Sequence, residues 1–152
     1  MQDRWFEDFQ VGDVTTFGGY TVSETEILEF AERYDPQDFH ADAALAEQSP
    51  FGGLIASGWH TAALMMRMMV DHYIPRQSSL GSPGVDELRW LKPVRPGDTL
   101  RVRLTVLAAD RSRGKPDRGR IYQLCEVLNQ HDDIVMTVKG TGLYRARAPI
   151  GS

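Results

Sequence analysis

A carboxylate and an imidazole lie five residues apart in the segment Tyr34-Asp35-Pro36-Gln37-Asp38-Phe39-His40. The unperturbed pKa values of Asp and His lie on either side of the range in which weak acids and bases work near neutral pH. Placed around one water molecule, two such groups can share the removal of its proton and deliver a proton to a neighbouring carbon. Asp35 and His40 are therefore the candidate acid/base pair.

A run of small residues follows at 52–58 and leads directly into an apolar segment. Small residues let a ligand carbonyl approach the backbone amides, and a helix amino terminus carries partial positive charge. We expect the amide of Gly58 to polarise such an oxygen, which a single donor typically stabilises by about 2.7–4 kcal/mol in a transition state. Gly53, Ser57 and Trp59 are the expected substrate-binding residues around it.

The same residues have plainer interpretations. Asp35 also fits a loop carboxylate that accepts hydrogen bonds from nearby amides. A divalent metal is a further alternative, but the segment offers one imidazole and no thiolate, so we expect no metal site. Simple packing roles are expected for His60, His72 and Cys125.

The helices that would position these residues have clear start and stop signals. Ser23-Glu24-Thr25-Glu26 is a capping box, which predicts a helix that Pro36 ends. Residues 59–74 are apolar on nearly every side, which predicts a helix that is surrounded by other structure. We expect a loop after residue 35 and a short helical turn at residues 43–48.

The remaining segments read as strands because apolar and polar residues alternate along them. They span residues 14–22, where Gly18-Gly19 suggests a bulge, and residues 85–92, 99–108, 120–129 and 134–145. One strand, a helical block and four further antiparallel strands make an α+β layout, in which one sheet curls around the apolar helix. We expect a single domain over residues 1–152.

The composition and net charge of the chain exclude some classes of binding partner. The chain has 152 residues, 41% hydrophobic and 25% charged, with a net charge of −4, which argues against nucleic acid or an anionic membrane as the main partner. One cysteine cannot form an internal disulfide, and no segment resembles a secretory signal or a spanning helix. We expect a cytoplasmic protein without a membrane partner.

Over roughly residues 8–145, the chain resembles the MaoC-like group of R-specific enoyl-CoA hydratases and dehydratases. The resemblance rests on Asp35 and His40, on Gly58 eighteen residues after His40, and on the later run Leu91-Lys92-Pro93-Val94-Arg95-Pro96-Gly97-Asp98. It implies the hotdog fold, in which a five-stranded antiparallel sheet wraps a long central helix. It also implies a homodimer or higher homo-oligomer with the active site at the interface.

The resemblance further implies a hydro-lyase that needs no cofactor. Asp35 and His40 would activate water for syn addition to a trans-2-enoyl thioester of coenzyme A, and the Gly58 amide would bind the thioester oxygen. The reverse reaction dehydrates a 3-hydroxyacyl thioester. The basic residues within 111–120 either contact the phosphates of coenzyme A or simply form a solvated hairpin.

Some positions depart from the family pattern. Gln37 and Asp38 stand where many members have Asn and Pro, and Met66 stands where some carry a Ser that orients the catalytic Asp. Trp59 is bulky and is expected to shorten or redirect the acyl pocket. Two alternatives stay open: a thioesterase on the same fold, which would release a free thiol, and a non-catalytic acyl-CoA or lipid-binding module.

Overall fold

The computed structural model describes residues 3–147 of the chain. A short 3-10 turn precedes nine regular elements, and four helices separate the first strand from the others. In chain order the elements are the turn Phe6–Asp8, β1 (Val14–Thr21), α1 (Glu24–Tyr34), α2 (Asp38–Ala41), α3 (Ala43–Glu47), α4 (Gly58–His72), β2 (Gly84–Trp90), β3 (Thr99–Arg111), β4 (Arg118–Leu128) and β5 (Ile134–Arg145).

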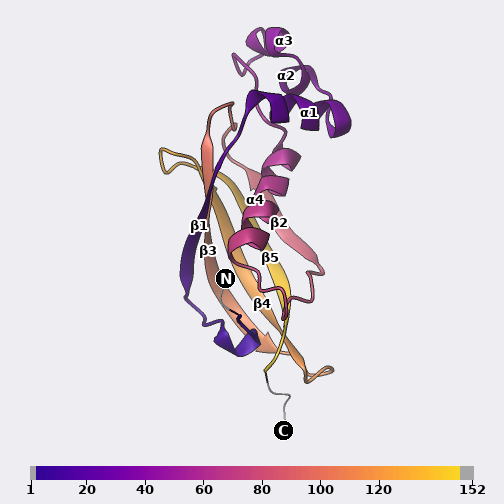
Figure 1. The fold of residues 1–152 in the computed structure, drawn as a ribbon, viewed down its shortest axis with the longest axis vertical. Helices are drawn as coiled ribbons and strands as arrows, with labels where there is room; N and C mark the ends of the chain where they lie inside the picture. Colours follow the sequence, from indigo (N-terminus) through magenta and orange to yellow (C-terminus); the bar gives the residue numbers. More distant parts are fainter. Residues whose placement is uncertain (1–2, 148–152) are drawn as a thin grey trace.

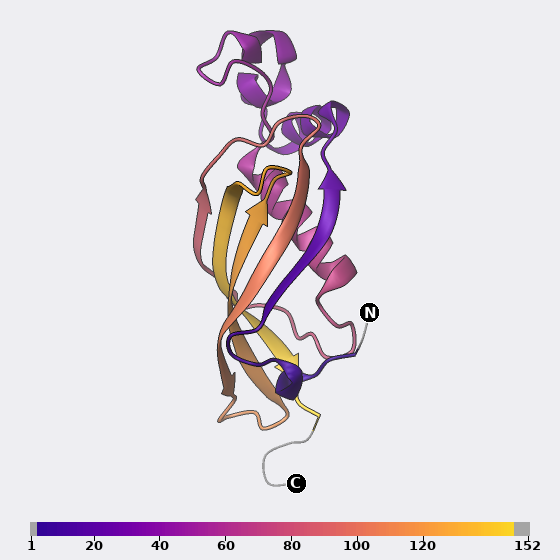
Figure 2. The same cartoon turned by 90° about the vertical axis from the view of Figure 1, so that its left-hand side faces the viewer.

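The strands form one five-stranded sheet in the order β1-β3-β4-β5-β2, with every neighbouring pair antiparallel. Helix α4 lies along one face of this sheet, and α1 to α3 gather at the end where α4 begins (Figures 1 and 2). The predicted α+β architecture, with one sheet around a central helix, is confirmed.

The core lies between α4 and the sheet. Alternate residues of β3 are buried, as the sequence pattern predicts, and Met65, Met68 and Met69 of α4 are buried above them. Each such side chain contributes about 1.5–3 kcal/mol when it is removed from water. The inward residues of β3 are Leu100, Val102, Leu104 and Val106.

The predicted irregularity at Gly18-Gly19 fixes how closely α4 approaches β1. The register of β1 against β3 shifts between Gly18 and Tyr20, and Gly18 has a φ of 103°. A Cβ atom at Gly18 would lie 2.5 Å from Sδ of Met68. Glycine is therefore required here both for the backbone conformation and for the contact with α4.

Two local predictions are corrected by the structure. The segment after Asp35 is not all loop, because residues 38–41 form the single turn α2. Strands β3 and β4 run further than predicted, so that only residues 112–117 form the turn of their hairpin. Within residues 3–147, no helix has the length and apolar character needed to span a membrane.

Candidate active site

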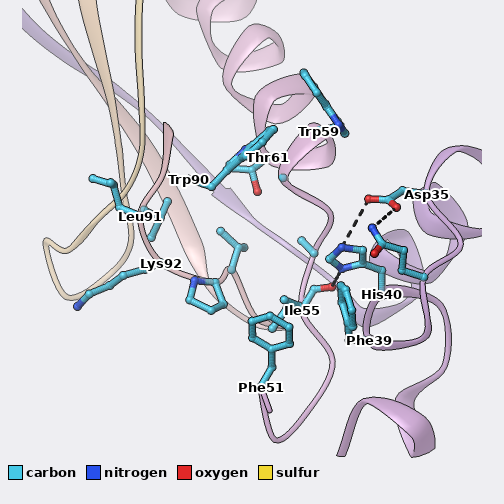
Figure 3. Close-up of a pocket in the computed structure, with 16 residues that line it drawn as sticks. Asp35, Phe39, His40, Phe51, Ile55, Trp59, Thr61, Trp90, Leu91 and Lys92 are labelled. Carbon is cyan, nitrogen blue, oxygen red and sulfur yellow. Dashed lines mark hydrogen bonds and ion pairs between the residues drawn. The ribbon is translucent and has the colours of Figure 1, made fainter. Parts of the chain in front are cut away.

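The structure brings Asp35 and His40 together in space. Nε2 of His40 lies 3.5 Å from Oδ2 of Asp35 (Figure 3). On the other side of the ring, Nδ1 of His40 lies 2.8 Å from the carbonyl oxygen of Ile55. A carbonyl oxygen only accepts, so Nδ1 must donate, and the neutral imidazole then presents a lone pair on Nε2. The lone pair therefore faces the carboxylate.

Two short elements bend the chain so that these side chains converge. Asp35 is the C-cap of α1, where its N–H donates to the carbonyl of Ala31, and α2 begins three residues later. The turn α2 places His40 in the interior, where it is 6% exposed. The backbone N–H of Ile55 donates to the carbonyl of Phe39, so two hydrogen bonds fix α2 against the segment that precedes α4.

Both carboxylate oxygens of Asp35 accept hydrogen bonds. Nε2 of Gln37 donates to Oδ1 at 2.8 Å, and Oγ of Ser57 donates to Oδ2 at 2.7 Å. Partial burial raises the pKa of Asp35, but the hydrogen bonds from Gln37 and Ser57 oppose it, and the pKa lies below its usual value. Asp35 is therefore ionised at neutral pH.

The amino terminus of α4 lies beside this pair. Ser57 is the N-cap and accepts a hydrogen bond from the Trp59 N–H, which leaves Gly58 as the first helical residue. Among the described residues, none accepts a hydrogen bond from the Gly58 N–H. The indole of Trp90 packs directly over Gly58, where a Cβ atom would lie 2.3 Å from the ring. Glycine is thus the residue that fits beneath Trp90.

A cavity of about 450 Å³ opens around these groups. Asp35, His40 and Gly58 all line it, and Leu91 and Lys92, in the loop after β2, lie on the side opposite Asp35 and His40 (Figure 3). Its size suits a small-molecule ligand. Its other lining residues are Gln37, Phe39, Phe51, Ile55, Ala56, Trp59, Thr61, Trp90, Leu91, Lys92, Pro93, Val94 and Val135.

The residues expected to bind substrate occupy different places. Trp59 lines the cavity and contacts Trp90 edge to face at a centroid distance of 5.0 Å. Ser57 is fully buried behind the cavity wall and contacts Asp35 instead. Gly53 lies outside the lining residues, near the guanidinium of Arg95. Across residues 3–147, no group of three or more His, Cys, Asp or Glu side chains could hold a metal ion.

The basic hairpin lies away from the cavity. Residues 111–120 are at the end of the sheet opposite α1 to α3 (Figure 1), so they do not line the space around Asp35. Lys92 lines the cavity instead, and its ammonium group forms a 3.1 Å ion pair with Asp133. Its side chain is exposed, so an ion-paired cation lies beside the cavity.

Sequence reasoning did not predict three contacts of the site, because each joins segments that are far apart in the chain. They are the hydroxyl of Ser57 on Asp35, the carbonyl of Ile55 on His40, and the indole of Trp90 over Gly58. Of these residues, only Ser57 could be assigned a place from the local sequence, because Ser before Gly58 at a helix start is a favoured N-cap. Cys125, by contrast, is buried as predicted, and burial raises its thiol pKa to about 12.

Comparison with known proteins gives the same fold. Residues 8–124 match the family model described as MaoC like domain. The crystal structure of a MaoC-like dehydratase from Rhodospirillum rubrum is 40% identical, with a TM-score of 0.88 over 95% of this chain and 99% of that one. R-hydratase PhaJ1 from Pseudomonas aeruginosa is 25% identical, with a TM-score of 0.74 over 94% of this chain and 86% of that one.

A curated relative carries an enzyme name. The 3-hydroxybutyryl-CoA dehydratase of Methylorubrum extorquens is 30% identical over 137 residues, which are 87% of this chain and 78% of that protein. The predicted hotdog architecture is confirmed by these likenesses together with the single wrapped sheet. The match over residues 8–124 and the Rhodospirillum structure place this chain in the MaoC-like dehydratase family.

Proposed function

We propose that the protein is a hydro-lyase that adds water to the double bond of a 2-enoyl thioester of coenzyme A, or removes it from the 3-hydroxyacyl thioester. The observation that carries the proposal is the convergence of Asp35 and His40 in a cavity that Gly58, the first residue of α4, also lines. An acid/base pair and a free amide donor are the two parts that this chemistry requires.

The acid/base step follows from the hydrogen bonds of the pair. A water molecule between Oδ2 of Asp35 and Nε2 of His40 would donate to both, since each atom presents a lone pair. As the water oxygen bonds to carbon 3, the pair takes one proton from the water and returns one proton to carbon 2. Both additions occur from the side that faces the pair, so addition is syn.

The electron pair of the double bond moves toward the thioester oxygen during this addition. The Gly58 N–H, at the positive end of α4, would stabilise that developing negative charge. The Trp90 indole packs against Gly58 at this first turn and lines the same cavity. Lys92, which lines the cavity, is the candidate contact for a phosphate of coenzyme A, in place of the distant hairpin 111–120.

A second copy of the chain is the proposed partner. Trp59, Met66 and Val70 form an exposed apolar stripe on α4, and Val85, Trp90 and Leu91 are exposed on and after β2. Strand β2 pairs with β5 alone, so its other edge is free within residues 3–147. An apolar face beside an open strand edge is a typical site for pairing between copies. We call this set of six residues the α4/β2 face.

The enoyl absorbance of trans-2-enoyl-CoA tests the function. The purified protein should remove the absorbance of short- and medium-chain substrates without releasing free thiol. Asp35→Asn and His40→Gln should each lower kcat/KM by about 10²- to 10⁴-fold. Undiminished activity in both variants would refute the site, whereas release of free coenzyme A would indicate a thioesterase.

A matched variant separates catalysis from folding. Asp38→Asn removes a carboxylate from the same bend, at an exposed position outside the cavity lining. It should keep the activity of the parent protein. Tight binding of acyl-CoA with no turnover in the parent protein would instead identify a binding module.

A further inference from the structure

A second cavity, of about 260 Å³, lies between α4 and the strands β4, β5 and β2. On α4 it is lined by Met65, Met66, Met69 and Val70, whereas the first cavity is lined there by Gly58, Trp59 and Thr61. Positions four and seven residues apart share one face of a helix. The two cavities therefore follow one another along the same side of α4.

Two glycines on β5 line this cavity. The inward row of β5 runs through Gly140 and Gly142. On β4, Gln123 pairs with Gly140 and Ile121 pairs with Gly142. A Cβ atom at Gly140 would lie 3.2 Å from the carbonyl oxygen of Gly84, and one at Gly142 would lie 2.9 Å from the ring of Tyr144. Glycine therefore fits at both positions of this wall, and Gln123 lines the cavity beside them.

Gln123 is the polar exception in an apolar row. Ile121, Cys125 and Val127 point inward from the same strand, and all are buried. Gln123 is only 9% exposed, and its side-chain oxygen, Oε1, has no hydrogen-bond partner among the described residues. Leaving a buried amide oxygen unpaired costs about 1–3 kcal/mol. A ligand group that donates a hydrogen bond would recover that cost.

We propose that this second cavity, the Gln123 cavity, binds the acyl chain of substrates that carry a hydroxyl group beyond the reacting carbons. A hydroxyl can donate to the amide oxygen and accept from the amide nitrogen, while the methionines, Cys125 and Val138 contact the rest of the chain. The inference rests on the proposed hydratase function, because the first cavity positions the thioester end.

The spacing along α4 sets the length of the chain. At about 1.5 Å per residue, the level of Met65 lies roughly 10 Å beyond Gly58, which corresponds to an acyl chain of about eight carbons. Met66, Val70 and Val85 line the outer side of the Gln123 cavity and are exposed in the single chain. All three belong to the α4/β2 face, so a second copy would close this side, and Gln123 would remain at the inner end.

Paired substrates test this preference. The kcat/KM of the full chain is measured for trans-2-octenoyl-CoA and for the same substrate with a hydroxyl on carbon 7 or carbon 8. The kcat/KM of the better of the two hydroxylated substrates should exceed that of plain octenoyl-CoA by about fivefold or more, which is the value of one recovered hydrogen bond. Gln123→Leu keeps the side-chain size but removes the amide, so it should abolish or reverse the preference.

Two further variants control for folding and for general effects. Gln123→Met offers a second apolar replacement, with thermal unfolding checked for both. Tyr122→Phe removes a hydroxyl from the next residue of β4, outside the lining of both cavities, and should keep the preference. Equal kcat/KM values for plain and hydroxylated substrates, or a preference that survives in both Gln123 variants, would overturn the inference. Failure to hydrate octenoyl-CoA and shorter enoyl-CoA substrates would instead overturn the proposed function itself.

Discussion

The Oγ atom of Ser57 donates a 2.7 Å hydrogen bond to Oδ2 of Asp35, the oxygen that also faces Nε2 of His40. Ser57 is at the same time the N-cap of α4, where it accepts from the Trp59 N–H. One buried hydroxyl thus joins the first turn of the central helix to the carboxylate of the acid/base pair. Met66, further along α4, lines the Gln123 cavity.

Ser57→Ala should move the acid limb of the kcat/KM profile to higher pH. The hydrogen bond from Ser57 is one of the contacts that lower the pKa of Asp35, so its loss raises that pKa. Asp35 then becomes protonated at a higher pH than in the parent protein. Activity should fall by about tenfold, the value of one hydrogen bond to a charged group, and the loss should be larger at low pH.

Ser23→Ala is the matched control for this experiment. Ser23 caps α1 through a 3.2 Å hydrogen bond from the Glu26 N–H, far along the helix from Asp35. Loss of either N-cap should cost about 1 kcal/mol of stability. An acid limb that moves equally in both variants, or in neither, would argue against a positioning role for Ser57.

Gly58→Ala should lower kcat/KM by more than tenfold while the protein still folds. The new methyl group would overlap the Trp90 indole, so either the ring or the first turn of α4 must move. A shift of about 1 Å in a positioned donor can cost about 10²-fold in rate. Partial recovery in Gly58→Ala/Trp90→Leu would assign the loss to this overlap. Gly114→Ala, in open space on the β3–β4 turn, should be neutral.

Val85→Lys should weaken self-association. Val85 is 59% exposed on the free edge strand β2, and a charge there opposes the close approach of an apolar face from a second copy. Analytical ultracentrifugation should show a dimer for the parent protein and a larger monomer fraction for the variant. Val11→Lys, equally exposed but next to β1 at the opposite edge of the sheet, should stay dimeric. A monomeric parent protein would remove the proposed interface.

His60→Phe should reduce the amount of stability that the protein loses between neutral pH and mild acid. His60 stacks on Phe30 and its Nε2 lies 4.0 Å from Glu26, which in turn accepts a hydrogen bond from the Tyr20 hydroxyl. Burial lowers the His60 pKa, and the nearby Glu26 only partly opposes this. In the unfolded chain His60 therefore binds a proton near pH 6.5, whereas in the folded chain it binds the proton only at a lower pH.

The contribution of His60 makes the folded protein less stable in acid. Stability is unaffected by His60 well above pH 6.5, and it decreases as the pH falls below that value, by at most about 1.4 kcal/mol per pH unit. Denaturant unfolding at pH 7.5 and pH 5.5 measures it. The parent protein should lose more stability between these two values than His60→Phe, in which the ring still stacks on Phe30 but cannot be protonated. Equal losses would mean that His60 titrates alike in both states.

The sequence alone determined the features that depend on local chemistry. The alternation of Leu100, Val102 and Leu104 predicts a strand because side chains alternate between the faces of a sheet. The capping box at Ser23 predicts the start of α1 because both of its hydrogen bonds are formed within four residues. Asp35, His40 and Gly58 were singled out in the same way, by residue type and spacing.

Tertiary structure decided what those residues contact. Ser57 meets Asp35 across 22 positions in the chain, and Ile55 meets His40 across 15. Trp90 reaches Gly58 only because β2 returns beside the start of α4. The turn α2 was likewise predicted as loop, since its four residues are too few for a periodic signal and it is held by Ile55. Such contacts depend on how distant elements pack, and no spacing within a short segment encodes that packing.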